Sequence, residues 1–236
     1  MKKLQYIIYI ALLIVGYSCE RDLESEGVSR TTSYLSFELT NGPVVTIPLG
    51  TAYTEPGFVA KEGDKDVTAS VEVDGTVDAT KLGVYTITYS GKNSDGFESS
   101  EERTVIVFDP AAPATDLSGN YISSVSRVAP ARAYTELNVS IQKMAPGFFY
   151  VSDFLGGFYD QGSNYQYGPT YAMTGYFILN ADNTITHISS LAPAWGDSLN
   201  ELVGGKYDPA TGTITWDAFY TSSNYDFKVT LVKEEE

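Results

Sequence analysis

Apolar and polar residues alternate along most of this 236-residue chain, and turn residues separate the alternating runs. One run places Leu137, Val139 and Ile141 on one face and polar residues on the other. Successive side chains of a β-strand point to opposite faces, so such a run predicts a sheet with one face in water. Because the chain also has 18 tyrosines, 21 glycines and few long helical patterns, we expect an all-β protein.

The first residues have the layout of an export signal. Lys2 and Lys3 precede an apolar run over 7–15 that is too short to span a bilayer as a helix. Small residues then lead to Cys19, and this order resembles bacterial lipoprotein signals, although the Leu usual at the third position before the cut is absent. The resemblance implies a signal peptide at 1–18 and acyl chains, palmitate among them, on Cys19. A plain secretory signal or an uncleaved anchor is the alternative.

Residues 19–33 are predicted to form an acidic tether, because charged side chains are dense there and bulky apolar groups are few. Acidic residues just after a lipidated cysteine resemble the surface-export signal of Bacteroidetes lipoproteins. This resemblance implies a protein that is anchored to the outer membrane through the lipid on Cys19 and faces the cell exterior.

The charge of the chain limits its partners. There are 30 acidic and 15 basic side chains, a formal charge of −15, and loss of Lys2 and Lys3 with the signal makes it −17. Such a surface repels phosphate backbones and anionic lipid headgroups, so we exclude nucleic acid as a partner.

The chain has one cysteine and one histidine, and both counts limit its chemistry. With Cys19 carrying a lipid, no disulfide forms, and we expect packing alone to hold the folded domains. A single histidine, His187, in a strand-like run excludes most zinc sites and most Ser-His or Cys-His arrangements. The carboxylates within 62–66 lack the glycine and closing glutamate of a calcium loop. We therefore expect no cofactor, no metal site and no catalytic residues.

The segment 34–108 is predicted to be a β-sandwich. Its expected strands are Tyr34–Leu39, Val44–Ile47, Val67–Val73, Val84–Tyr89 and Thr104–Phe108. Three stretches, at 49–60, 82–89 and 103–107, resemble the bacterial Ig-like domain of many surface proteins. The resemblance implies that Tyr53, Pro56, Gly57, Gly83 and Tyr85 shape the sandwich, which serves as a spacer or interaction module.

Residues 109–116 are rich in proline and alanine and predict an extended linker. The second domain, 117–236, is expected to be antiparallel and to close as a barrel or pack as a sandwich. Its expected strands are Leu137–Lys143, Phe148–Ser152, Gly175–Leu179, Ile185–Ile188, Thr213–Tyr220 and Tyr225–Val232.

Four stretches of this domain, at 116–121, 151–159, 195–198 and 205–216, resemble the C-terminal β domain of Bacteroidetes surface lipoproteins. The genes of that family often accompany starch-utilisation-type (SusC/SusD-like) importers. The resemblance implies a nutrient-capture setting and names no ligand.

Aromatic residues crowd the stretch 156–171, where alternation stops and Gly, Asn and Pro predict a long loop. A tyrosine offers a flat apolar face and a hydroxyl, which suit stacking on sugar rings or peptide side chains. A second loop carries Trp195, while the alternating Trp216 is expected in the core. The candidate ligand-binding residues are Tyr159, Asp160, Asn164, Tyr165, Tyr167, Tyr171 and Trp195. The alternative is that the tyrosines pack the loop onto its own sheet.

These observations predict a non-catalytic surface lipoprotein that binds glycan or peptide oligomers as an accessory to an outer-membrane importer. A docking lipoprotein of the importer without a nutrient ligand is the first alternative, and a hydrolase is the second. No Gly-x-Ser-x-Gly elbow, phosphate loop or HExxH helix occurs in the sequence.

Overall fold

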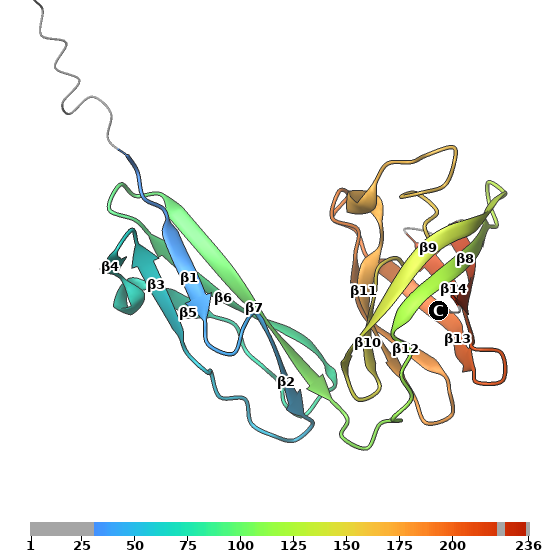
Figure 1. Ribbon diagram of the computed structural model, residues 1–236, viewed down its shortest axis with the longest axis horizontal. Coiled ribbons are helices and arrows are strands. Elements are labelled where there is room, and N and C mark those ends of the chain that lie inside the picture. Colours follow the sequence, from blue (N-terminus) through green and yellow to red (C-terminus); the bar gives the residue numbers. More distant parts are fainter. Residues whose placement is uncertain (1–30, 221–224, 235–236) are drawn as a thin grey trace, which may run out of the picture. The chain divides into compact units, whose positions relative to one another are not determined.

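The computed structural model describes residues 31–220 and 225–234 (Figure 1). Cys19, the signal and most of the tether lie outside the described residues. Strands dominate, and the helical elements described are two single-turn 3-10 helices, η1 (Thr68–Ser70) and η2 (Pro169–Tyr171). No helix in the described part of the chain is long and apolar enough to cross a membrane. The all-β prediction is confirmed.

Two sheets form the N-terminal sandwich. Its strands are β1 (Leu35–Leu39), β2 (Val44–Pro48), β3 (Phe58–Glu62), β4 (Lys65–Asp66), β5 (Glu72–Asp74), β6 (Gly83–Lys92) and β7 (Glu98–Phe108). One sheet has the order β1-β3-β4 and the other β2-β7-β6-β5, with β2 parallel to β7. Ile87, Tyr89 and Val105 of the second sheet are buried against Phe37 and Phe58 of the first. The two packed sheets agree with the Ig-like sandwich predicted from the sequence.

The predicted strand Val67–Val73 is wrong, because η1 interrupts it. The Thr68 amide donates to the Asp66 carboxylate at 2.9 Å, and the Thr68 hydroxyl accepts from the amide of Ala60 at 2.9 Å. These bonds turn the backbone between β4 and β5. The strand β3 (Phe58–Glu62) was not predicted, since Ala60 is its one buried residue and gives little apolar signal.

A fully buried arginine cross-links the sandwich. Arg103 donates from Nε to the Tyr89 hydroxyl at 2.9 Å and lies 3.2 Å from the Glu55 carboxylate. Its other N–H groups donate to backbone carbonyls of the opposite sheet's loops, at Thr40, Gly42 and Gly57. A guanidinium presents five donors, and here all its nitrogens have acceptors. The domain therefore depends on a satisfied buried charge as well as on packing, which corrects the expectation of packing alone.

The Glu55 carboxylate completes this network. Burial opposes its ionisation, but hydrogen bonds from Tyr53 and Tyr89 and the charge of Arg103 outweigh burial and hold the pKa of Glu55 below its ordinary value. Tyr53 belongs to the stretch whose resemblance to the Ig-like domain implied a structural role. In the structure this role is a hydrogen bond: the Tyr53 hydroxyl donates to the carboxylate of Glu55, which pairs with Arg103.

We predict that Arg103→Met destabilises the sandwich by about 3–5 kcal/mol, because it leaves the half-buried Glu55 without its cation and several carbonyls without donors. Both tryptophans lie in the second domain, so urea unfolding followed by tryptophan emission should change little while the far-UV circular dichroism transition shifts. Lys81→Met is the control, because Lys81 is exposed and pairs with Asp78 at 3.6 Å. Equal effects of the two substitutions would contradict the role of Arg103.

The second domain is a nearly closed antiparallel barrel. Its strands are β8 (Gly119–Arg127), β9 (Arg132–Ala145), β10 (Phe148–Val151), β11 (Thr174–Leu179), β12 (Ile185–Leu191), β13 (Leu199–Asp208), β14 (Thr213–Tyr220) and β15 (Asp226–Lys233). Their order is β12-β11-β10-β9-β8-β15-β14-β13. A bridge between Thr184 and Lys206, beside a hydrogen bond from the Tyr207 amide to the Asn183 carbonyl, joins the two outer strands. Of the two predicted architectures, the barrel is the one formed.

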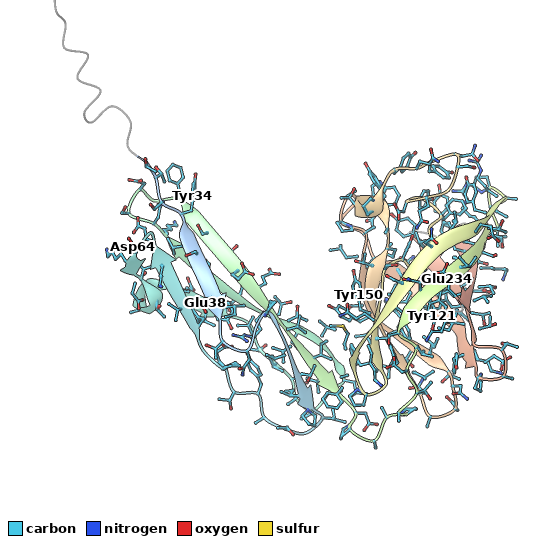
Figure 2. All side chains as sticks on the ribbon, viewed as in Figure 1. Tyr34, Glu38, Asp64, Tyr121, Tyr150 and Glu234 are labelled. Atoms are coloured by element: carbon cyan, nitrogen blue, oxygen red, sulfur yellow. The ribbon has the colours of Figure 1, made fainter. Side chains whose placement is uncertain are left out.

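Side chains fill the barrel interior (Figure 2). Phe149, Phe177, Trp216 and Phe227 come from four strands and are buried together. The prediction that Trp216 lies in the core is confirmed, and its indole N–H donates to the Phe154 carbonyl at 2.8 Å. Because the interior is filled by side chains, a ligand would have to bind outside it, and the loops at the two ends of the barrel form the candidate surfaces.

The two ends of the barrel carry different connections. Short hairpin turns at 146–147, 180–184 and 209–212 join strands at one end. The connections at 128–131, 152–173 and 192–198 leave the strands at the opposite end, which we call the mouth, and the last two are the longer ones (Figure 1). The linker enters β8 (Gly119–Arg127) at its first residue, so it joins the barrel at the hairpin end.

Candidate functional site

A buried carboxylate holds the connection 152–173, which we call the aromatic loop. Asp153 is the second residue after β10, is 2% exposed, and accepts backbone N–H bonds from Leu155 at 2.8 Å and Gly157 at 2.9 Å. It accepts a third from Met173, the last residue before β11, at 3.0 Å. One side chain therefore ties the beginning of the loop to its end. The sequence prediction did not include Asp153.

The same burial affects the charge of this group. Burial raises the pKa of Asp153 to about 6, three backbone donors act in the opposite direction, and the nearby Asp160 carboxylate adds to the rise. A carboxyl whose folded pKa lies above its unfolded value stabilises the fold most at acid pH. Its contribution is lost as the pH rises from about 4 to above 6.

We predict that Asp153→Asn destabilises the barrel at every pH, because its amide NH2 faces backbone donors, and that the loss is larger at pH 4 than at pH 7. The pKa shift bounds that difference at about 3 kcal/mol. Urea unfolding of both proteins followed by tryptophan emission measures it. Asp182→Asn at the hairpin end is the control: hydrogen bonds from Thr184 lower the pKa of Asp182, so its stabilisation is instead lost toward acid pH. Equal pH profiles for the two variants would contradict the assignment.

The first turn of the aromatic loop inserts its apolar side chains into the barrel interior. Phe154, Leu155 and Phe158 are fully buried in the core cluster. Gly156 has a φ of +63° and lies so close to β8 that an added Cβ would be 2.6 Å from the Ser123 hydroxyl, so glycine is required there. The Ser123 hydroxyl also donates to the Gly156 carbonyl at 2.9 Å.

Tyr159 is buried beneath the exposed rings of the mouth, whereas the sequence predicted that it would contact a ligand. It is 9% exposed, and Arg127 donates to its hydroxyl at 3.2 Å. The guanidinium of Arg127, itself buried, lies 4.9 Å from the centre of the Phe158 ring. Tyr159 is therefore a core residue, and so far the alternative of loop packing applies.

Two aromatic rings of the mouth remain accessible. Trp195 is 37% exposed and Tyr167 is 49% exposed. Tyr171 connects them, with ring centroids 4.9 Å from Trp195 and 5.0 Å from Tyr167. The Ala194 amide donates to the Thr170 carbonyl at 2.9 Å, which joins the two loops. The sequence placed these residues on separate loops, and the fold brings them into one row.

The remaining candidates lie beside this row. Tyr165 is half-buried and packs edge-on against Tyr159, with centroids 5.0 Å apart. Asn164 is exposed and accepts a hydrogen bond from the Tyr134 hydroxyl at 3.0 Å. Asp160 accepts one from the Gln161 side chain at 3.2 Å. The candidate residues thus gather at the mouth, some as support and some at the surface.

Asp197 and Tyr220 were not among the predicted site residues. The Tyr220 hydroxyl donates to the Asp197 carboxylate at 2.9 Å, and the Tyr220 ring lies 6.0 Å from Trp195 at 27°. Burial and the adjacent carboxylate raise the pKa of Tyr220, so it stays neutral as a donor. Tyr220 is the last residue of β14. Nothing in the sequence indicates that it contacts Asp197 or Trp195, because β14 and the loop at 192–198 come together only in the folded barrel.

The chain's one histidine, His187, belongs to β12. His187 packs edge-on against Phe154, with centroids 5.1 Å apart, and burial lowers the pKa of its imidazole, so it is neutral at pH 7. Within the described part of the chain, no three His, Cys, Asp or Glu side chains group as a metal site.

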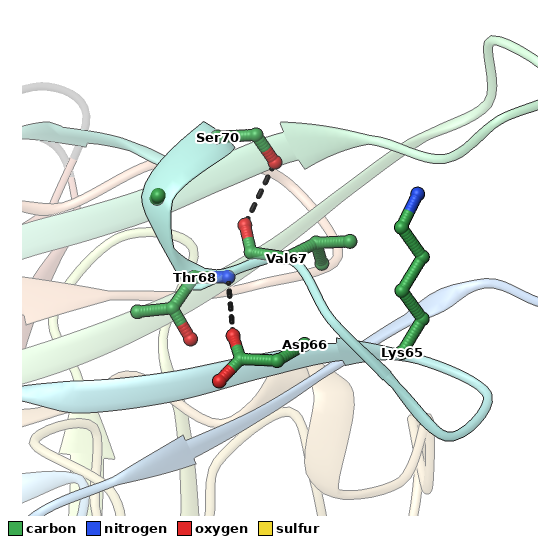
Figure 3. A pocket seen from close by; sticks show the side chains of 6 residues that line it. Lys65, Asp66, Val67, Thr68 and Ser70 are labelled. Carbon is green, nitrogen blue, oxygen red and sulfur yellow. Dashed lines mark hydrogen bonds between the residues drawn. The ribbon is translucent and has the colours of Figure 1, made fainter.

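The Ig-like sandwich carries a shallow open pocket around 65–70, whose lining comes from one turn of the chain (Figure 3). Asp66 lies there with its carboxylate bonded to the Thr68 amide, and the Ser70 hydroxyl donates to the Val67 carbonyl. These bonds shape the turn itself. The pocket brings together no residues from distant parts of the chain.

Comparison with known proteins gives matches over both domains. Residues 37–107 match the family model described as "Bacterial surface protein, Ig-like domain". Residues 109–233 match a second model, whose description reads "-like, C-terminal domain". Among curated protein sequences, none matches the chain.

The solved structures similar to this chain include the following two. The first is the lipoprotein BT2262 from Bacteroides thetaiotaomicron, which is 36% identical, with 85% of this chain and 100% of that chain covered and a TM-score of 0.46. The second contains CBM51-2 in complex with GlcNAc and INT domains from Clostridium perfringens ZmpB. It is 15% identical, with 50% of this chain and 29% of that chain covered and a TM-score of 0.27.

Proposed function

Because this chain belongs to the family of the Bacteroides thetaiotaomicron lipoprotein BT2262, we propose that it is a non-catalytic, lipid-anchored surface protein that binds oligomers at the barrel mouth. The Ig-like surface domain and the C-terminal family domain, both expected from the sequence, are confirmed by the two family matches. In this proposal the lipid is on Cys19, in the outer membrane, and the folded domains face the cell exterior. The ligand is a glycan or peptide oligomer passed to a starch-utilisation-type importer.

The observation that carries the proposal is the row in which the half-buried Tyr171 joins the exposed rings of Tyr167 and Trp195. Large aromatic rings at a surface provide contact area at low conformational cost and dominate many binding sites. These rings are held from below by Tyr159 and by the loop that Asp153 fixes, so little ordering is needed on binding. The mouth also lies at the end of the barrel opposite the linker, which supports access for a ligand.

We predict that Tyr167→Ala with Trp195→Ala lowers affinity for the ligand at least about tenfold. Thermal unfolding should remain one cooperative transition at a lower temperature, because both partly exposed rings also contact Tyr171. The mature chain with Cys19→Ser is titrated by calorimetry with mixtures of glycan oligomers and of peptides from a casein digest. Phe97→Ala is the matched control, because Phe97 is an exposed aromatic residue of the Ig-like domain.

Unchanged affinity in the double variant would contradict the assignment of the mouth. Absence of any heat signal, together with co-purification of the chain with a porin, would replace the proposal by a docking role. Release of product from an oligomer would place the protein among the hydrolases.

We predict that Cys19→Ala abolishes incorporation of labelled palmitate and moves the protein from the detergent phase to the aqueous phase, because Cys19 is the chain's only cysteine. Metabolic labelling in the native host followed by phase partitioning measures both effects. The matched control is Ser18→Ala, which keeps the thiol. Labelling that persists in Cys19→Ala would contradict the anchor.

A further inference from the structure

We propose that the mouth binds an uncharged glycan, with the C–H face of a pyranose ring lying flat on the indole of Trp195. This inference rests on the proposed function, because it names the ligand class of the same site. Four features of the mouth support it: a fixed indole, rings without gaps between them, backbone amides that are already paired, and carboxylates at the rim.

The Trp195 indole is fixed in orientation. Tyr159 and Tyr171 meet it edge-on, with centroids 5.0 and 4.9 Å away and interplanar angles of 86° and 75°. Tyr220 lies nearly parallel to it at 6.0 Å. The turn that carries it is closed by the Gly196 amide donating to the Ala192 carbonyl at 2.9 Å. An indole held in this way needs little ordering on binding, and the 37% of Trp195 that is exposed is the surface available to the flat C–H face of a pyranose.

The rings of the mouth form a platform without an aromatic cage. Centroids are 5.4 Å apart between Tyr165 and Tyr167, 5.0 Å between Tyr167 and Tyr171, and 4.9 Å between Tyr171 and Trp195. At these separations the rings contact each other. A cage for an ammonium group needs several ring faces around an open space. The packing of these rings therefore disfavours choline-like or lysine ligands.

The backbone of the mouth is already paired. The Tyr167 amide donates to the Tyr159 carbonyl at 3.1 Å, and the Gly168 amide donates to the Asp160 carbonyl at 3.2 Å. Across the two loops, the Ala194 amide is likewise bonded to Thr170. An extended peptide binds by adding a strand to unpaired backbone groups. Because these amides are taken, a ligand that binds through ring faces and hydroxyl groups fits better.

The carboxylates at the rim disfavour an acidic ligand. Asp197 lies beside the indole and Asp160 follows Tyr159, and each carboxylate has acceptor capacity left for sugar hydroxyls. The same carboxylates repel uronate or sulfate groups. Of the two arginines that contact the tyrosines of the aromatic loop, Arg127 is buried and Arg132 lies over the Tyr165 ring at 5.4 Å.

Affinity electrophoresis tests this inference. The mature chain with Cys19→Ser is run in native gels that contain starch, dextran, xyloglucan or galactomannan, and in parallel gels with polygalacturonate or chondroitin sulfate. We expect retardation by at least one neutral polysaccharide and none by the acidic ones. Trp195→Ala should weaken the retardation at least about tenfold, Trp195→Phe should weaken it less because a ring remains, and Phe97→Ala should leave it unchanged.

The buried Trp216 provides the folding control, because its emission in Trp195→Ala should match that of an intact core. Retardation by the acidic polysaccharides alone, neutral binding that survives Trp195→Ala, or no retardation by any neutral polysaccharide would overturn the inference. In the last case, heat with the casein peptides that depends on Tyr167 and Trp195 would refute the glycan class and leave the proposed function standing. No response to either ligand class would refute both.

Discussion

The carboxylate of Asp153 is the interaction on which the mouth of the barrel depends. It binds amides at both ends of the aromatic loop, at Leu155 and Met173, so it determines where the loop leaves and rejoins the sheet. From there Phe154 and Phe158 enter the barrel interior, and Tyr159 is buried above them. The exposed rings rest on this support. A change at one buried oxygen therefore acts on the whole presented surface.

Both domains use a buried charge where other exported proteins use disulfides. In the sandwich, Arg103 binds three carbonyls and the Glu55 carboxylate, and in the barrel Asp153 binds three amides. A buried charge that is fully hydrogen-bonded contributes specificity, because alternative packings leave it unsatisfied. In each case the partners are backbone groups of loops. Apolar packing alone would not fix the positions of these loops.

Strand alternation predicted the all-β class and most strands, and it failed where the inward face is polar or interrupted. In β8, Ser123 and Arg127 lie on the buried face with Tyr121 and Val125, so the apolar period is hidden. In β13, glycines and register shifts break the alternation. Such strands are identified only by their partners in the closed sheet.

The same logic explains which site residues the sequence revealed. Loss of alternation correctly predicted the aromatic loop, and composition identified its tyrosines, but burial of Tyr159 depends on the barrel beneath it. Two signals for the buried charges were present. Arg103 shares a strand face with Val105 and Val107. Asp153 is the second residue of the loop after a buried strand, where Asp commonly binds the amide two residues on. Contact between Trp195 and Tyr171 joins segments that only the fold brings together.

The central claim is that the mouth presents a preformed aromatic surface to a neutral glycan. The two indole N–H signals of Trp195 and Trp216 test it in one nuclear magnetic resonance titration with a mixture of neutral oligosaccharides, because the chain has only these two tryptophans. Trp216 lies beneath the same loop with its N–H bonded to Phe154, so it is an internal reference. The account predicts that the Trp195 signal shifts and the Trp216 signal stays in place. A Trp195 signal that does not move, or two signals that move together, would contradict it.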